Sequence, residues 1–180
     1  MNLKHSRVSA LVVGCLLGLL LTLLILDLTS SSDTATSRLQ RGQKPFAPSL
    51  TLNRLSGKGE VSLASLQGRT VLLSFWASWC AGCKEEAHEL NALAKKFAPA
   101  GLTVVGVDVR DSVAAARAFA KRERIDYELV RDSGDRAATD FGVAGLPTTF
   151  VISPEGRVVK VFIGIAEPGV LTDEAHALLG

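Results

Sequence analysis

The sequence contains little cysteine and no excess of charge of either sign. Its 180 residues include three cysteines, 20 basic residues and 18 acidic residues, for a formal net charge of +2. Three cysteines cannot build the dense disulfide network of a small secreted scaffold, and so balanced a charge gives no reason to expect nucleic acid as a partner. No internal repeat occurs, and no glycine-rich phosphate loop follows a predicted strand. The length indicates one globular domain with an appendage.

A long apolar run occurs near the amino terminus. Residues 8–26, VSALVVGCLLGLLLTLLIL, form an uncharged stretch of 19 residues. At ~1.5 Å per helical residue this stretch would extend about 28 Å, close to the thickness of the hydrocarbon core of a bilayer. The run exceeds the roughly 7–15 apolar residues of a cleaved signal peptide, and no clear A-x-A site follows it. We therefore predict that residues 1–28 are a cytoplasmic n-region followed by an uncleaved transmembrane signal-anchor.

The charges on either side of this run predict its orientation. Lys4 and Arg7 precede it, whereas Asp27 and Asp33 follow it. Because basic residues stay on the cytoplasmic side, we expect a single-pass protein of the cell inner or cytoplasmic membrane, with its C-terminal domain in the periplasm or outside. The sequence VVGC, which ends at Cys15, resembles a lipoprotein lipobox. Apolar residues continue after it, so we interpret Cys15 as part of the membrane helix.

A polar segment separates this run from a region of alternating strands and helices. Residues 29–44, TSSSDTATSRLQRGQK, lack apolar periodicity, which predicts a flexible linker. In residues 45–180 the expected strands are 49–55, 60–66, 71–76, 102–109, 148–152 and 158–164, and the expected helices are 79–98, 112–124 and 170–179. This order predicts an α/β domain of thioredoxin-like layout, with a central mixed β-sheet covered by helices on both faces and an N-terminal hairpin.

Two cysteines lie three positions apart, directly after the predicted strand 71–76. A helix that begins near Cys80 places Cys83 one turn further along the same face, about 5–6 Å away. A disulfide needs Cα atoms about 4.4–6.8 Å apart, so this pair can open and close. The amino-terminal end of a helix stabilises a thiolate. We therefore predict that Cys80 is the nucleophile, that Cys83 resolves the mixed disulfide, and that Trp79 forms the rim of the active site.

Two other interpretations of the thiol pair are weaker. Structural zinc needs four ligands, and outside the predicted anchor only His88 and His176 could join the cysteines, at unrelated spacing. A permanent structural disulfide across so short a loop removes little entropy from the unfolded chain. We therefore expect redox exchange, with no metal site and no cofactor beyond the redox-active disulfide.

A second motif is VAGLPTTFVI, residues 143–152, in which Pro147 directly precedes a predicted strand. Cis peptide bonds are nearly confined to proline, and a proline before a strand is a place where one can occur. Only about 5–6% of the bonds before proline are cis. The motif by itself therefore favours an ordinary trans bond.

Together these motifs resemble a known family. WCxxC after a buried strand, the continuation C-x-x-E-x-x-E-L, VVGVDV and GLPTTFVISPEGRVV are similar to the membrane-anchored thioredoxin-like proteins of the TlpA, ResA and CcmG (DsbE) group. The resemblance implies a bacterial protein thiol-disulfide oxidoreductase that reduces disulfides in partner proteins, in cytochrome c-type biogenesis or copper-site assembly. A membrane thiol donor would re-reduce it. The resemblance also implies that Pro147 is cis, that Leu146 offers its backbone to substrate, and that Glu86 tunes the thiols.

The sequence departs from this family at several positions. Gly82 and His88 stand where members usually carry proline, so the redox potential of the relatives cannot be transferred to this chain. Ser74 replaces the buried aspartate of cytoplasmic thioredoxins, which leaves Glu86 as the nearest base; its simpler role is to complement the helix dipole. A disulfide-donating oxidase and, in another class, a copper or zinc carrier that uses the thiols and His88 are therefore alternative functions.

Overall fold

The computed structural model describes residues 13–24 and 33–179, which belong to two units, Met1–Asp33 and Thr34–Gly180. In the first unit, residues 13–24 form a helix. The apolar segment predicted to span the membrane, residues 8–26, lies partly outside the described residues. Within the described part of the chain, no helix is both long enough and apolar enough to cross a membrane.

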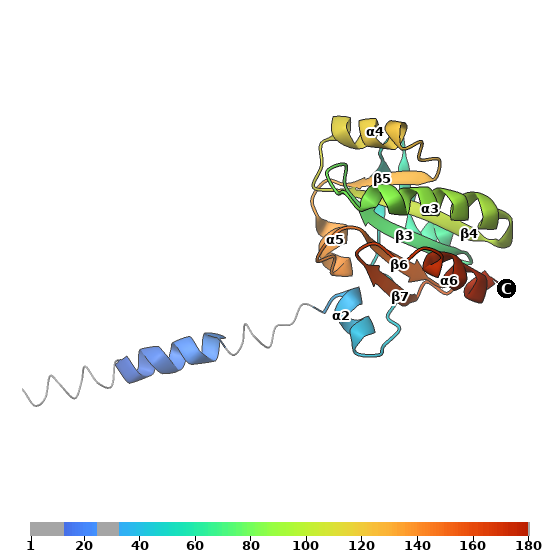
Figure 1. The fold of residues 1–180 in the computed structure, drawn as a ribbon. Helices are drawn as coiled ribbons and strands as arrows, with labels where there is room; N and C mark the ends of the chain where they lie inside the picture. The colour runs from blue at the N-terminus through green and yellow to red at the C-terminus, as the bar shows by residue number, and fades with distance from the viewer. Residues whose placement is uncertain (1–12, 25–32, 180) are drawn as a thin grey trace, which may run out of the picture. The chain divides into compact units, whose positions relative to one another are not determined.

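The described residues of the second unit form a seven-stranded mixed sheet with the strand order β2-β1-β5-β4-β3-β6-β7 (Figure 1). The pairs β3–β4 and β4–β5 are parallel, and the remaining pairs are antiparallel. The strands are β1 (Thr51–Arg54), β2 (Glu60–Ser62), β3 (Thr70–Trp76), β4 (Leu102–Val109), β5 (Glu128–Asp132), β6 (Thr148–Ile152) and β7 (Val158–Ile163).

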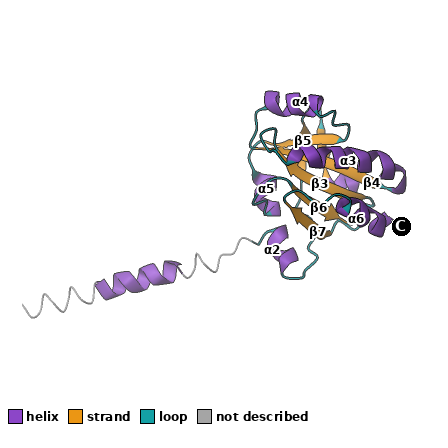
Figure 2. Cartoon of the chain, in the orientation of Figure 1, coloured by secondary structure: helices purple, strands orange, loops and turns teal. Residues whose placement is uncertain are grey.

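Helices cover both faces of this sheet, as Figure 2 shows. One face carries α3 (Cys83–Phe97), α4 (Val113–Arg122) and α6 (Val170–Leu179). The other face carries α2 (Ala35–Gln40) and α5 (Arg136–Phe141). The predicted central mixed sheet with helices on both faces is therefore confirmed.

Strand β3 is an interior strand, between β4 and β6, and all seven of its residues are buried. Successive side chains of a strand point to opposite faces. Val71, Leu73 and Phe75 accordingly pack against the face that carries α2 and α5, whereas Leu72 and Trp76 pack against the face of α3, α4 and α6. A nearly continuous apolar sequence is what a strand covered on both sides requires.

Three phenylalanine rings form the centre of the core on the α5 face. Phe75, Phe141 and Phe150 have no exposed surface. The ring centroids of Phe141 lie 5.5 Å from those of Phe75 and 4.9 Å from those of Phe150, in tilted and edge-to-face arrangements. Such pairs add to the free energy that burial of their area supplies. Phe141 thereby attaches the short helix α5 to strands β3 and β6.

Part of the range predicted to be a flexible linker, residues 29–44, is helical in the structure. Residues 29–32 lie outside the described residues, but Ala35–Gln40 form helix α2, in which Ala35 and Thr36 are buried. Thr34 caps this helix by accepting a hydrogen bond from the Ser37 amide, 3.2 Å away. The Thr36 hydroxyl donates to the carbonyl of Phe141 at 2.8 Å. Because the contact of Thr36 is with a residue 105 positions away, local periodicity did not reveal it.

Two further elements, β5 and α5, were also missed. The sequence of β5, ELVRD, contains only two apolar residues between charged ones, and α5 has six residues. The apolar residues of β5 are too few, and α5 is too short, for a hydrophobic period to be recognised. The predicted hairpin is observed as β1 and β2, although Leu63–Leu66 form a 3-10 helix in place of a longer second strand.

We predict that Phe141→Ala lowers the free energy of unfolding by about 3–5 kcal/mol, because it leaves a cavity between two buried rings. Urea unfolding followed by circular dichroism measures this change. Val113→Ala, at a position 39% exposed at the start of α4, is the control and should change stability by less than about 0.5 kcal/mol. A loss for Phe141→Ala as small as that of the control would contradict the assignment of α5 to the core.

Candidate functional site

The two cysteines form a disulfide where β3 leads into α3. The Cα atoms of Cys80 and Cys83 are 5.4 Å apart. Helix α3 was predicted to begin near Trp79, but it begins at Cys83, with Gly82 as its N-cap. Cys80 lies in a turn before the helix, in which its amide donates to the Ala77 carbonyl at 3.1 Å. Cys80 is therefore beside the amino-terminal end of α3, not within its first turn.

The two sulfur-bearing residues differ in burial. Cys83 is 2% exposed and Cys80 is 7% exposed. Both belong to the apolar cluster that contains Trp76 and Phe119. The residue nearer to solvent is the one that can meet a substrate disulfide first, so this geometry supports Cys80 as the attacking thiol.

The loop that carries Cys80 is held by the loop that follows β4. The amide of Ser78 donates to Oδ2 of Asp111 at 2.6 Å. The indole N–H of Trp79 donates to the Arg110 carbonyl at 3.0 Å. The side chain of Trp79 is nevertheless 60% exposed, which places an apolar surface next to the disulfide, as the prediction of a rim residue requires.

Pro147 lies at the same end of the sheet as the disulfide. The Leu146–Pro147 peptide bond is cis, and strand β6, which pairs with β3, begins at the next residue. A Cβ atom placed on Gly82 would lie 3.6 Å from Cδ of Pro147 and only 2.5 Å from a side-chain carbon of Ile165. The structure therefore brings Gly82 between Pro147 and Ile165, and the absence of a side chain at Gly82 leaves room for Ile165.

Glu86 is buried in the first turn of α3, three residues after Cys83. Its Oε1 accepts a hydrogen bond from the Ser74 hydroxyl at 3.2 Å and a second, short one from the Thr149 hydroxyl. Ser74 and Thr149 are register partners on β3 and β6, so the sheet presents their hydroxyls side by side. Thr149 was not identified from the sequence; the polar pair TT before an apolar run was the available signal.

Burial raises the pKa of the Glu86 carboxyl above its ordinary value, and the charge of Glu89 acts in the same direction. The two hydroxyl hydrogen bonds lower this pKa in part. Oε2 of Glu86 is buried and has no partner among the described residues. A carboxyl whose pKa is raised by burial, one helical turn from Cys83, can accept or return a proton.

The histidines considered as metal ligands have other contacts. Nε2 of His88 lies 3.4 Å from a carboxylate oxygen of Glu123, and the side chain of His88 is 55% exposed. The ring of His176 packs edge-on against that of Phe97, with the two ring centroids 4.7 Å apart. Over residues 13–24 and 33–179 there is no group of three or more His, Cys, Asp or Glu side chains that could hold a metal ion. The geometry adds no support for a copper or zinc carrier.

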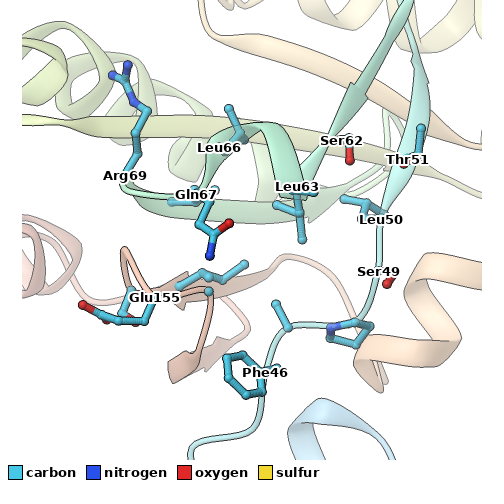
Figure 3. Close-up of a pocket in the computed structure, with 17 residues that line it drawn as sticks. Phe46, Ser49, Leu50, Thr51, Ser62, Leu63, Leu66, Gln67, Arg69 and Glu155 are labelled. Atoms are coloured by element: carbon cyan, nitrogen blue, oxygen red, sulfur yellow. The ribbon is translucent and has the colours of Figure 1, made fainter.

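A pocket of about 450 Å³ lies at the end of the sheet opposite to the disulfide. Figure 3 shows residues that line it. The pocket is lined by residues that precede or begin β3, such as Arg69 and Val71, and by residues at or after the end of β6, such as Ile152 and Glu155. Because β3 leads into the cysteine loop at its other end, this pocket is separate from the disulfide. It contains neither cysteine.

Comparison with known proteins places the site in context. The family model described as AhpC/TSA matches residues 44–161. The chain is 35% identical over 127 residues to the thiol-disulfide oxidoreductase ResA of Bacillus subtilis, which covers 71% of this chain and 70% of that one. It is 33% identical over 135 residues to the thiol:disulfide interchange protein DsbE of Pseudomonas fluorescens, which covers 74% of this chain and 73% of the relative.

Solved structures agree with these relatives. A thiol:disulfide interchange protein of the thioredoxin family from Chlorobium tepidum superposes with a TM-score of 0.68 at 29% identity, over 77% of this chain and 98% of that one. A secreted disulfide oxidoreductase of Mycobacterium tuberculosis gives a TM-score of 0.65 at 25% identity, over 72% of this chain and 96% of that one. The predicted thioredoxin-like fold is therefore confirmed.

We predict that Glu86→Gln raises the free energy of unfolding, relative to that of the parent, more at pH 8 than at pH 4. The pKa of Glu86 is raised in the folded state, so its favourable contribution to stability is complete below the pKa of the unfolded chain. That contribution is lost as the pH rises through the folded value. Glutamine removes this pH dependence and keeps an acceptor for both hydroxyls.

Unfolding free energies of the parent and Glu86→Gln, measured at pH 4, 6 and 8, provide the test. Glu60→Gln, on the exposed edge strand β2, is the matched control and should follow the parent at every pH. A parent that becomes more stable from pH 4 to pH 8 relative to Glu86→Gln would contradict the raised pKa.

Proposed function

Because this chain belongs to the AhpC/TSA family and is a thiol-disulfide oxidoreductase related to ResA and DsbE, we propose that it reduces disulfides in partner proteins outside the cytoplasm. One observation carries this proposal. The Cys80–Cys83 disulfide lies at the amino-terminal end of α3, next to the cis Pro147. A helix terminus favours a thiolate there, and the exposed Trp79 offers an apolar surface to a bound polypeptide.

The reaction starts from the dithiol form. The Cys80 thiolate attacks one sulfur of the substrate disulfide, forms a mixed disulfide and releases the other substrate sulfur as a thiolate. Cys83 then gives up its proton, for which Glu86 is the acceptor, and attacks the sulfur of Cys80. The substrate leaves as a dithiol, and the enzyme retains the Cys80–Cys83 disulfide. Two electrons have moved to the substrate, and a membrane thiol donor must return them.

The direction of transfer follows the reduction potential of the pair. Thioredoxin-like proteins range from about −270 mV for strong reductants to about −120 mV for a disulfide donor. The proposed reducing role rests on the relationship to ResA and DsbE, and the buried Glu86 carboxyl supplies the proton acceptor that resolution by Cys83 needs. An oxidase that donates the same disulfide is the alternative within this chemistry.

The proposed location rests on the amino-terminal sequence. The 19 apolar residues at 8–26, preceded by Lys4 and Arg7, favour a signal-anchor that leaves the catalytic domain outside the cytoplasm. The relationship to a secreted disulfide oxidoreductase supports an extracytoplasmic domain. We propose apocytochromes c and copper-site proteins as the partner class, because such proteins need free thiols when their cofactor or metal is inserted.

We predict that Cys80→Ser reduces disulfide-reductase activity at least about 100-fold, because no mixed disulfide can form without the nucleophile. Reduction of insulin by the full-length protein, with dithiothreitol as the electron source, measures this activity. Cys15→Ser is the matched control and should keep the parental rate. Equal activity of the parent and Cys80→Ser would contradict the proposed function.

Cys83→Ser should accumulate covalent complexes with its partners, because the mixed disulfide on Cys80 can no longer be resolved. Non-reducing electrophoresis of membranes, followed by mass spectrometry, identifies the captured proteins. The double variant Cys80→Ser/Cys83→Ser should capture none. If Cys83→Ser captures no more than the double variant, disulfide exchange with partner proteins is ruled out as the role of this pair.

Glutathione titration of the Cys80–Cys83 pair determines the direction of transfer. For a reductase we expect a potential nearer to about −270 mV than to −120 mV. A potential close to the oxidising limit would assign the chain to the disulfide donors.

A further inference from the structure

We propose that Asp108, acting through Arg131, positions the loop after β4. This loop contacts Ser78 and Trp79, and its position thereby sets the reactivity of Cys80. Asp108 is a positioning residue in this proposal, since it acts through other side chains and does not touch the substrate. The inference rests on the proposed thiol-disulfide function and goes beyond it, because the pair belongs to strands β4 and β5 and not to either cysteine motif.

Asp108 occupies a central place in the sheet. It has no exposed surface. On one side it is the register partner of Trp76 in β3, three residues before Trp79, and on the other side it is the register partner of Arg131 in β5. Arg131 Nη1 donates to Oδ2 of Asp108 at 2.9 Å. The carboxylate therefore fixes the position of the Arg131 guanidinium.

Arg131 in turn contacts the loop that follows β4. Its Nη2 donates to the backbone carbonyl of Asp111. The same Asp111 accepts the amide of Ser78 through Oδ2, at 2.6 Å. The carbonyl of the preceding residue, Arg110, accepts the indole N–H of Trp79. These hydrogen bonds, together with the peptide bond between Arg110 and Asp111, connect the buried carboxylate to the two residues before Cys80.

The loop itself is constrained at Arg110. This residue has a φ of +52°, in the left-handed region that side chains other than glycine seldom adopt. Its Nε donates to Oδ2 of Asp135 at 2.8 Å. Such a conformation persists only where surrounding contacts hold it, and the contacts of Arg131 with Asp111 and of Arg110 with Asp135 are among those that the structure provides.

The charge of Asp108 is unfavourable for folding. Burial and the nearby charge of Asp111 raise the pKa of Asp108 to about 7, against the opposing effect of Arg131. These are the charged groups that act on Asp108; β3 contributes the uncharged Trp76 at the paired position. Oδ1 of Asp108 is without a hydrogen-bond partner over residues 33–179. Because the folded pKa exceeds the usual value, ionisation lowers stability as the pH rises through about 7. Stability alone does not account for an aspartate here.

A structural role for Asp108 would make Asp108→Asn less stable at pH 8, whereas a positioning role would not. The stability of this variant therefore separates the two roles. The test uses the full-length protein with Cys15→Ser and 5-fluorotryptophan, in which the two tryptophans give two fluorine resonances; Trp79→Phe assigns them. In the oxidised parent, the Trp79 resonance should shift with pH, with a midpoint near the pKa of Asp108. In Asp108→Asn, this transition should disappear, and the thermal midpoint at pH 8 should not fall.

In the reduced protein, the rate at which iodoacetamide alkylates Cys80 should decrease roughly 10-fold at pH 7 in Asp108→Asn, because the loop no longer holds the thiol in place. Arg131→Lys keeps the charge but cannot bridge Asp108 and Asp111 with two nitrogens. Like Asp108→Asn, it should therefore abolish the Trp79 transition and slow the alkylation of Cys80. Asp140→Asn, from an exposed ion pair with Arg136 on α5, is the matched control and should change neither.

The proposal would be overturned if Asp108→Asn kept both the pH-dependent shift of the Trp79 resonance and the alkylation rate of the parent. It would equally be overturned if Asp108→Asn lost thermal stability while both readouts stayed unchanged. Neither readout requires a substrate. A failure of the proposed function, seen as a parent that does not reduce insulin, is therefore distinguishable from a failure of this inference.

Discussion

The pairing of β3 with β4 on one side and with β6 on the other is the constraint on which the rest of the structure depends. It buries all seven residues of β3. It also brings three chain segments to one end of the sheet: the cysteine loop after Trp76, the loop after Val109, and the cis Pro147 before β6. The disulfide, the loop after β4 and the cis proline come together because these three strands are neighbours.

Two buried carboxyl groups lie on the face of the sheet that α3, α4 and α6 cover. Most side chains on this face are apolar, yet Glu86 lies among them and accepts hydrogen bonds from the hydroxyls of Ser74 and Thr149. Asp108, on the neighbouring strand β4, accepts a hydrogen bond from Arg131 on β5. A buried carboxyl costs free energy when it ionises. Both residues therefore lower the stability that an apolar core would provide, and both adjoin the segment that carries the thiols.

The patterns that predicted the fold correctly belong to its longest and most apolar elements. Strands β3, β4, β6 and β7 and helices α3, α4 and α6 each present a recognisable apolar period or run, because each covers a large part of the core. The segments α2, β5 and α5 are short, and their buried residues are few. Thr36 and Phe141 hold two of them in place through contacts with distant residues, which leave no local pattern.

The sequence by itself determined the spacing of Cys80 and Cys83, the strand that precedes them and the helix that follows them, since covalent distance and periodicity are local properties. Only the tertiary structure decided the surroundings of the thiols. The hydroxyl of Thr149 reaches Glu86 across 63 positions of the chain, and Arg131 reaches Asp108 across 23. Which side chains meet across such separations depends on strand order and register, and these result from packing the whole core.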